Sequence, residues 1–170
     1  MSNLFSNSPA DIPPISSWTQ YMTMALQEAK NAADHQEVPV GAVLVKDGAV
    51  IASACNQRET THDPTAHAEM LCMRAGAQLL GDWRLRGCTL FVTLEPCPMC
   101  AGAMAMSQLS GCIFGAADPQ KGCCGSVYDL PGDPAFQGNT LWAGGIMADD
   151  CKAVLDDFFL KKREKTKPTL

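Results

Sequence analysis

The sequence predicts an α/β fold in which helices cover both faces of a central sheet. Short apolar runs alternate along the chain with stretches whose apolar residues recur every three or four positions, which are the patterns of strands and helices. The chain has 170 residues, the length of one ordinary domain, and it contains no internal repeat and no linker. Its composition, with 46% hydrophobic and 18% charged residues, is that of a globular protein and argues against a disordered chain.

The first half is expected to begin with a helix and a β-hairpin. From about residue 18 to 34, apolar residues spaced by three or four positions predict an amphipathic helix, with one stripe formed by Met22, Leu26, Ala29 and Ala33. A continuous apolar run over 40–45 predicts a strand. Lys46-Asp47-Gly48 then predicts the turn into a second strand over 49–56.

The next helix has a start signal in the sequence. Asp63-Pro64-Thr65 combines turn and cap residues, so we expect Thr65 to be the N-cap of a helix that ends near Leu80. One face of this helix would be apolar, formed by Ala66, Met70, Met73, Ala77 and Leu80. The remaining elements are expected to be strands over 88–94, 112–116 and 140–143, and helices over 98–108 and from 148 onward.

The chain is expected to consist of a short arm, one domain and a basic tail. Residues 1–15 are rich in Asn, Ser and Pro without periodicity, which predicts a loose arm, and they lack the basic and apolar segments of a signal peptide. The domain is expected to span 16–163, and 164–170 form the tail. No stretch is long and apolar enough to cross a membrane. The 9 cysteines, an odd number without an export signal, favour reduced thiols and a cytoplasmic protein.

Two short motifs carry the clearest indication of chemistry. His67 lies two residues before Glu69, and Cys97 and Cys100 lie three residues apart after Pro96. One imidazole and two thiols suit zinc, and three protein ligands leave a fourth position for water, as in catalytic zinc sites. Glu69 would then take and return protons. The pattern H-x-E followed by P-C-x-x-C is typical of zinc-dependent nucleobase deaminases.

Two other interpretations of these motifs stand beside the catalytic one. A Cys-x-x-Cys pair suits a structural zinc knuckle or two core cysteines, and a zinc module can bind RNA without catalysis. Glu69 discriminates between them, because a structural site has no use for a carboxylate beside an open position. Structural sites also have four protein ligands as a rule, and no fourth Cys or His stands at a suitable spacing. The motifs therefore favour an enzyme.

The surroundings of both motifs resemble those of bacterial tRNA adenosine deaminases. The resemblance rests on His-Asp-Pro-Thr-Ala-His-Ala-Glu at 62–69 and Leu-Glu-Pro-Cys-Pro-Met-Cys-Ala-Gly-Ala-Met at 94–104, with further matches from about Trp18 to Arg163. It implies a cytidine-deaminase-like fold, with three layers (α/β/α) and a mixed five-stranded central sheet, and it implies a homodimer. The implied reaction is hydrolysis of adenosine to inosine at the wobble position of a tRNA anticodon.

The same resemblance assigns roles to individual residues by position. It implies one zinc ion per chain, bound by His67, Cys97 and Cys100, with Glu69 as the proton carrier. The other implied contacts are with the substrate: Asn56 on the base, Asp118 on the backbone of the flipped nucleotide, and backbone N–H groups near Ala68 and Cys97 facing the reacting water.

Some positions depart from the family pattern. Gln137-Gly138-Asn139 stands where family members often have Asn-His-Arg, and Ala117 stands where some have arginine, so basic groups that would contact RNA are missing. A deaminase of a free base or nucleoside, of the guanine or cytosine type, is therefore the alternative. The net charge is −5, yet residues 161–170 hold 5 of the 13 basic and only 1 of the 18 acidic side chains. This basic tail favours a tRNA anticodon stem-loop as the partner.

Overall fold

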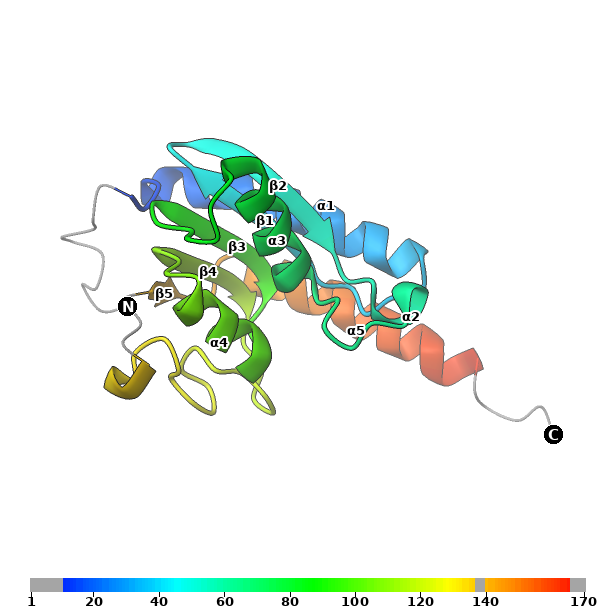
Figure 1. Cartoon of the computed structure of the whole chain (residues 1–170). Helices are drawn as coiled ribbons and strands as arrows, with labels where there is room; N and C mark the ends of the chain where they lie inside the picture. Colours follow the sequence, from blue (N-terminus) through cyan, green and yellow to red (C-terminus); the bar gives the residue numbers. More distant parts are fainter. Residues whose placement is uncertain (1–10, 137–139, 166–170) are drawn as a thin grey trace.

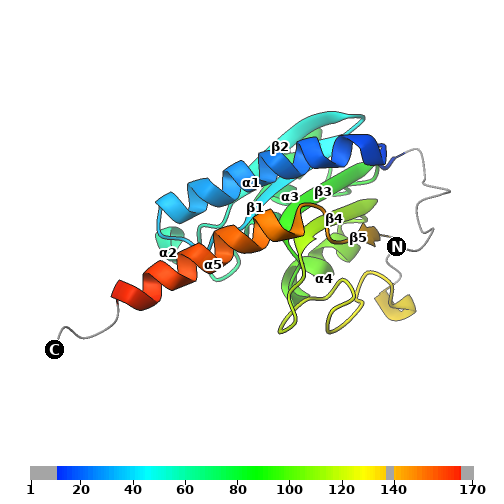
Figure 2. The same cartoon turned by 180° about the vertical axis from the view of Figure 1, so that it is seen from behind.

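The computed structural model describes residues 11–136 and 140–165 and has the three layers that the sequence predicts (Figure 1). The five strands are β1 (Gly41–Lys46), β2 (Ala49–Cys55), β3 (Cys88–Leu94), β4 (Gly111–Ala116) and β5 (Leu141–Ala143). The helices are α1 (Trp18–Asp34), α2 (Arg58–Thr61), α3 (Ala68–Leu80), α4 (Pro98–Met106) and α5 (Ala148–Lys165), with 3₁₀ turns η1 (Ile15–Ser17) and η2 (Pro134–Phe136). Helices α3 and α4 cover one face of the sheet, and α1 and α5 cover the other (Figures 1 and 2).

The sheet is mixed, with the order β2-β1-β3-β4-β5. Strand β1 pairs antiparallel with β2 and β3, whereas β3, β4 and β5 run parallel to one another. The tight hairpin between β1 and β2 requires positive φ at both central residues, and Asp47 and Gly48 provide it, with φ of 50° and 75°. Because β3 and β4 are parallel, their carboxyl ends meet at one edge of the sheet, where open α/β sheets bind their ligands.

Side chains that alternate along the central strands build a hydrophobic core on each face. In β3, Leu90 and Val92 are buried with α3 and α4, and Phe91 is buried with α1. Helix α1 lies so close to the sheet that a Cβ on Gly41 would overlap the α1 backbone at Ala25. A residue without a side chain is therefore required at the start of β1.

The start of α3 differs from the prediction. The helix begins at Ala68 and its N-cap is His67, so the prediction of Thr65 as the N-cap is wrong. Asp63 accounts for the difference, because its carboxylate accepts hydrogen bonds from the Thr65 backbone N–H and hydroxyl, at 2.8 and 2.7 Å, and holds these residues in a turn. The buried face also shifts, to Ala68, Glu69, Cys72, Met73 and Gly76.

Buried or helical residues lie just outside both of the boundaries expected for the domain, at residues 16 and 163. Ile12, expected in a loose arm, is 7% exposed within the α1-side core, and the Pro13 carbonyl accepts a hydrogen bond of 2.8 Å from the Trp18 indole. At the other end α5 continues through Lys165, past the expected boundary at residue 163. Residues 1–10 and 166–170 lie outside the described residues, and so does the departure at Gln137-Gly138-Asn139. None of the described helices is long and apolar enough to span a bilayer.

Candidate metal centre and substrate pocket

The starts of two helices bring the three predicted metal ligands together. His67 is the N-cap of α3, Cys97 is the N-cap of α4, and Cys100 lies in the first turn of α4. The His67 Nδ1 atom lies 3.7 Å from the Cys97 Sγ and 3.5 Å from the Cys100 Sγ, and the two sulfurs are 3.7 Å apart. Within the described part of the chain, this is the one group of three or more His, Cys, Asp or Glu side chains close enough together to share a metal ion.

These distances fit a tetrahedral zinc ion. With Zn–S distances of about 2.3 Å and Zn–N of about 2.0–2.1 Å, a tetrahedron separates two sulfurs by about 3.8 Å and sulfur from nitrogen by about 3.6 Å. The observed distances of 3.7, 3.7 and 3.5 Å form a triangle of that size. A three-ligand site of this composition leaves one coordination position without a protein ligand, as catalytic zinc sites do.

The pKa values of the three predicted ligands also favour the binding of a metal cation. The hydrogen bond from the Cys100 thiol, together with the weaker effect of His67, outweighs burial and lowers the pKa of Cys97 to about 4. The hydrogen bond with Cys97 and burial raise the pKa of Cys100, and the hydrogen bond with Cys97 raises the pKa of His67. The low pKa of Cys97 suits a metal ligand, because thiolates rather than thiols bind zinc.

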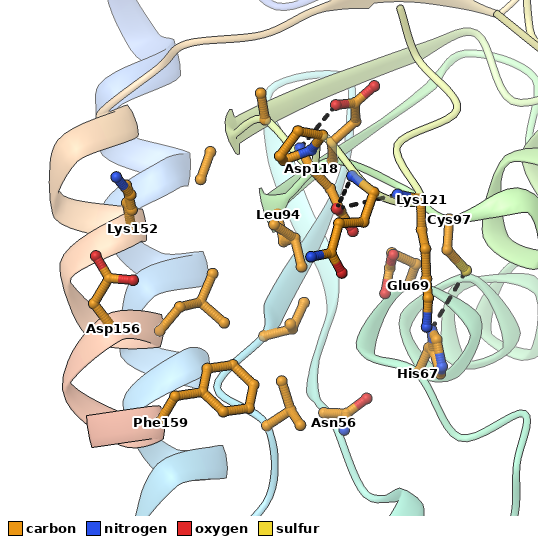
Figure 3. Close-up of a pocket in the computed structure, with 18 of the residues that line it drawn as sticks. Asn56, His67, Glu69, Leu94, Cys97, Asp118, Lys121, Lys152, Asp156 and Phe159 are labelled. Carbon is orange, nitrogen blue, oxygen red and sulfur yellow. Dashed lines mark hydrogen bonds between the residues drawn. The ribbon is translucent and has the colours of Figure 1, made fainter. Parts of the chain in front are cut away.

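Glu69 lies beside the ligands in the first turn of α3 and is only 4% exposed. Burial raises the pKa of its carboxyl group, so the cost of protonating this side chain is lower than in water. In Figure 3 its carboxylate points into the space between Cys97 and Asn56. This combination suits a group that takes up a proton and returns it.

The metal triangle lies at one side of a cavity of about 500 Å³ at the carboxyl ends of β3 and β4. A volume of this size is typical of sites for small molecules or single nucleotides. The side chains that surround it come from six segments of the chain: Val38, Val40, Asn56, Arg58, His67, Glu69, Leu94, Glu95, Cys97, Ala116–Lys121, Lys152, Leu155, Asp156 and Phe159. Figure 3 shows α5 closing the cavity opposite the metal ligands.

Two of the three residues predicted to contact the substrate line this cavity, and the third does not. Asn56 and Asp118 line it, on opposite walls from the end of β2 and the segment after β4. Ala68 does not line it, because its side chain is fully buried in the core under α3. The role predicted for Ala68 concerned its backbone N–H, which lies at the start of α3 between the cavity-lining residues His67 and Glu69.

Glu95 holds the segment after β4 against the metal-binding segment. Its carboxylate is 2% exposed and accepts hydrogen bonds from the backbone N–H groups of Asp118, Cys124 and Ser126, at 3.0, 2.9 and 3.0 Å, and from the Ser126 hydroxyl. The Cys123 N–H also donates to the Pro96 carbonyl, at 2.8 Å. Since Cys97 follows two residues later, one buried side chain sets the position of Asp118 relative to the metal ligands.

Replacing Glu95 with glutamine should therefore loosen the Asp118 wall. Glutamine has one acceptor oxygen where the carboxylate has two, so at least one loop N–H loses its acceptor, at about 1–3 kcal/mol in the free energy of unfolding. We expect KM for the substrate to rise more than kcat falls, with zinc retained. Urea denaturation, metal analysis and steady-state kinetics measure the three quantities, and an unchanged unfolding midpoint would contradict this role.

Several residues that line or support the cavity had no predicted role. Leu94 and Phe159 are among the apolar residues that line it. Glu37 is 1% exposed and bonded to Asn56, and only its place in front of the apolar run at 38–45 marks it in the sequence. The cavity exists because segments distant in the sequence meet at one edge of the sheet, which local periodicity cannot indicate.

Comparison with known proteins agrees with this site. Residues 16–116 match the family model for the cytidine and deoxycytidylate deaminase zinc-binding region. The tRNA-specific adenosine deaminase of Bacillus subtilis (strain 168) is 46% identical over 147 residues, which are 86% of this chain and 91% of that protein. A solved structure from studies of A-to-I editing by tRNA:A34 deaminases has a TM-score of 0.78 and 39% identity, over 81% of this chain and 99% of that one.

A guanine deaminase has a similar fold. The enzyme from Bacillus subtilis is 30% identical, with a TM-score of 0.53, over 88% of this chain and 77% of that chain. The match to the tRNA-enzyme structure is higher in both identity and TM-score. The metal triangle, the buried glutamate and these matches together show that the chain belongs to the cytidine and deoxycytidylate deaminase zinc-binding family, among the relatives of the tRNA-specific adenosine deaminases.

Proposed function

We propose that this protein is a zinc-dependent hydrolase that converts adenosine to inosine at the wobble position of a tRNA anticodon. The observation that carries the proposal is a three-ligand zinc site with a buried glutamate beside it, open to a cavity of nucleotide size. The choice of tRNA rests on the similarity to the Bacillus subtilis enzyme and to the A34 deaminase structure.

The chain supplies proton transfer and positioning. When bound, zinc supplies a Lewis acid that makes a water molecule acidic near neutral pH. Glu69 accepts a proton from the attacking water and donates it to the ring nitrogen of the base, and it then carries the second proton to the exocyclic amine. The water oxygen first forms a C–O bond with the ring carbon, and the C–N bond to the protonated amine then breaks, so that ammonia leaves. Asn56 orients the base, and Asp118 holds the nucleotide that has been flipped into the cavity.

The basic end of α5 is the surface that we assign to RNA. Residues 1–160 hold 8 basic and 17 acidic side chains, so most of the protein repels RNA phosphates. RNA is therefore expected to bind only where basic side chains are concentrated. Helix α5 places Phe159 in the cavity wall, and the helix then continues beyond the body of the protein (Figure 2). Lys161, Lys162 and Arg163 follow directly, which puts them within reach of the nucleotides that flank a flipped base.

Removing residues 161–170 should weaken tRNA binding while leaving zinc content unchanged. Each lost phosphate contact reduces the slope of log K against log salt by about 0.7–0.9, so a total reduction of about 1–3 is expected. Binding of an anticodon stem-loop, measured between low and physiological salt, tests this. If affinity and salt slope are the same with and without these residues, the tail is only a solvated helix end.

The second candidate is a deaminase of a free base or nucleoside, which the guanine deaminase similarity favours. Incubation of the zinc-loaded protein with total tRNA and, in parallel, with guanine, cytosine and nucleosides separates the two. The proposed function predicts inosine in tRNA and little ammonia from the small substrates. Ammonia from guanine or cytosine without inosine in tRNA would replace the proposal with the alternative.

We also propose that the protein is a homodimer that associates through α4. Met99, the adjacent pair Gly102 and Ala103, and Met106 are spaced by about one helical turn, and they lie on the less buried side of the helix. Met106 is 71% exposed, and the space beside Gly102 is open. A second copy would cover this stripe, and light scattering should then give twice the chain mass of 18.1 kDa.

The location that we propose is the cytoplasm. All 9 cysteines are free, and 7 of them are buried, as in proteins of reducing compartments.

A further inference from the structure

Three carboxylates are buried in the described part of the chain, and all three belong to the site: Glu37, Glu69 and Glu95. The proposed reaction uses Glu69, and Glu95 holds the Asp118 segment. Glu37 lies between α1 and β1, outside both sequence motifs, and it makes no ion pair among the described residues. A buried carboxylate is costly unless hydrogen bonds compensate it, so its partners indicate its purpose.

The partners of Glu37 lie on the wall of the cavity. Its Oε1 accepts a hydrogen bond of 2.7 Å from the Thr60 backbone N–H in α2, and its Oε2 accepts one of 3.3 Å from Asn56 Nδ2. Burial acts to raise the pKa of Glu37, but hydrogen bonds from the backbone of Thr60 and its neighbours outweigh it and lower the pKa. Glu37 is therefore ionised near neutral pH, and an ionised carboxylate can only accept hydrogen bonds.

This fixes the orientation of the Asn56 amide. The NH₂ end must face Glu37, because the amide oxygen would meet another acceptor there. The oxygen is then turned into the cavity, and Figure 3 shows it on the side of Glu69 and His67. Asn56 is 5% exposed and lines the cavity, so its oxygen is available to a bound nucleotide.

We propose that Glu37 is a positioning residue that makes Asn56 a hydrogen-bond acceptor in the substrate pocket, so that the pocket selects a nucleotide presenting a donor at that point. This rests on the proposed function for the identity of the nucleotide. Two groups of adenosine have this chemistry: the exocyclic amine of the base and a hydroxyl of the ribose. Glu37 itself touches neither.

The Glu37→Gln substitution should change the group that Asn56 presents to the cavity from a hydrogen-bond acceptor to a donor. The Thr60 N–H still requires an acceptor, so it donates to the amide oxygen of the glutamine. The glutamine NH₂ group then faces Asn56. Asn56 then satisfies that donor by turning its oxygen toward it, and its own NH₂ group enters the cavity. A donor on the substrate would then face the NH₂ group of Asn56. Because one hydrogen bond is lost and two donors are placed together, kcat/KM should fall by about 10- to 100-fold.

A second substitution should restore the acceptor. In the Glu37→Gln protein, Asn56→Asp provides one oxygen for the glutamine NH₂ group and one for the cavity. In the protein that keeps Glu37, Asn56→Asp instead places two carboxylates together. The double variant should therefore be more active than either single variant, which a merely structural role of Glu37 would not produce. Glu28→Gln is the matched control, since Glu28 also accepts a side-chain hydrogen bond, of 2.7 Å from Ser53, outside the cavity.

The experiment combines kinetics on an anticodon stem-loop with NMR of the Asn56 side-chain amide. With Glu37, the Asn56 NH₂ protons should exchange slowly with solvent, and in Glu37→Gln they should exchange at least tenfold faster. Stem-loops with ribose or 2′-deoxyribose at the target distinguish the donors: the Glu37→Gln penalty persists with deoxyribose if the base donates and disappears if the 2′-hydroxyl donates. Zinc content is measured for every variant.

Two results would overturn the inference: unchanged amide exchange in Glu37→Gln, or a double variant no more active than the better single variant. The NMR result does not depend on the substrate. If the unsubstituted protein does not convert the stem-loop, the proposed function fails, while slow exchange that Glu37→Gln abolishes would still support the positioning role.

Discussion

Replacing Glu69 with glutamine should lower kcat by about 10²- to 10⁴-fold, the usual contribution of a positioned acid–base group. Glutamine keeps the size and hydrogen-bonding reach of the side chain but cannot accept the proton that the attacking water must lose. Glu69 is 4% exposed in the first turn of α3, and it lines the cavity together with the ligands His67 and Cys97. The measurement is single-turnover inosine formation in an anticodon stem-loop.

The control for this variant is its metal content and stability. Glu69 lies outside the ligand triangle, so the variant should still bind one zinc ion per chain. Burial raises the pKa of Glu69, so folding favours its neutral form over the ionised one. Glutamine is neutral at every pH, and the variant should be at least as stable as the unsubstituted protein above the ordinary pKa of a glutamate. A near-normal rate in Glu69→Gln would remove Glu69 from the reaction.

Replacing Cys97 with alanine should abolish stable zinc binding and, with it, all turnover. Two ligands would remain of the three that the structure brings together, and the lost one is the thiol whose pKa is lowered to about 4. Metal analysis after dialysis against a weak chelator should give far less than one zinc ion per chain. Cys55→Ala is the matched control, since Cys55 is a free, half-buried thiol that belongs neither to the ligands nor to the cavity. Full zinc occupancy in Cys97→Ala would disprove the assigned ligand set.

Local patterns predicted most of the fold. The helix at Trp18–Asp34 and the strand at Cys88–Leu94 have the predicted bounds, because their apolar periodicity is long and is bounded by turn residues. The error at Thr65 arose from local chemistry that competes with the helix: Asp63 holds Thr65 in a turn, and the chain becomes helical only at Ala68. The mixed five-stranded sheet was implied by the family resemblance rather than by periodicity, and the order of the strands was not predicted.

The sequence predicted the metal ligands and the proton carrier of the site, but it predicted less well the residues that hold the cavity wall in place. His67, Glu69, Cys97 and Cys100 stand out in the sequence because few sites other than a catalytic zinc centre combine these residue types at this spacing. Glu37 carries no such signal, since a single glutamate in a sequence is usually a surface residue, and Glu95 is marked only by its place two residues before Cys97. Only the three-dimensional structure shows that both are buried and that each is hydrogen-bonded to one residue of the cavity wall, Asn56 or Asp118.

The central claim is tested most directly by mapping inosine in a single RNA. Zinc-loaded protein is incubated with an anticodon stem-loop that has adenosine at the wobble position, and with a matched stem-loop that has adenosine only at another loop position. Nucleoside analysis should find inosine in the first RNA alone, and the Glu69→Gln protein should form it at least about 100-fold more slowly. If neither RNA is converted while free guanine or cytosine releases ammonia, the protein acts on small substrates and the tRNA assignment is wrong.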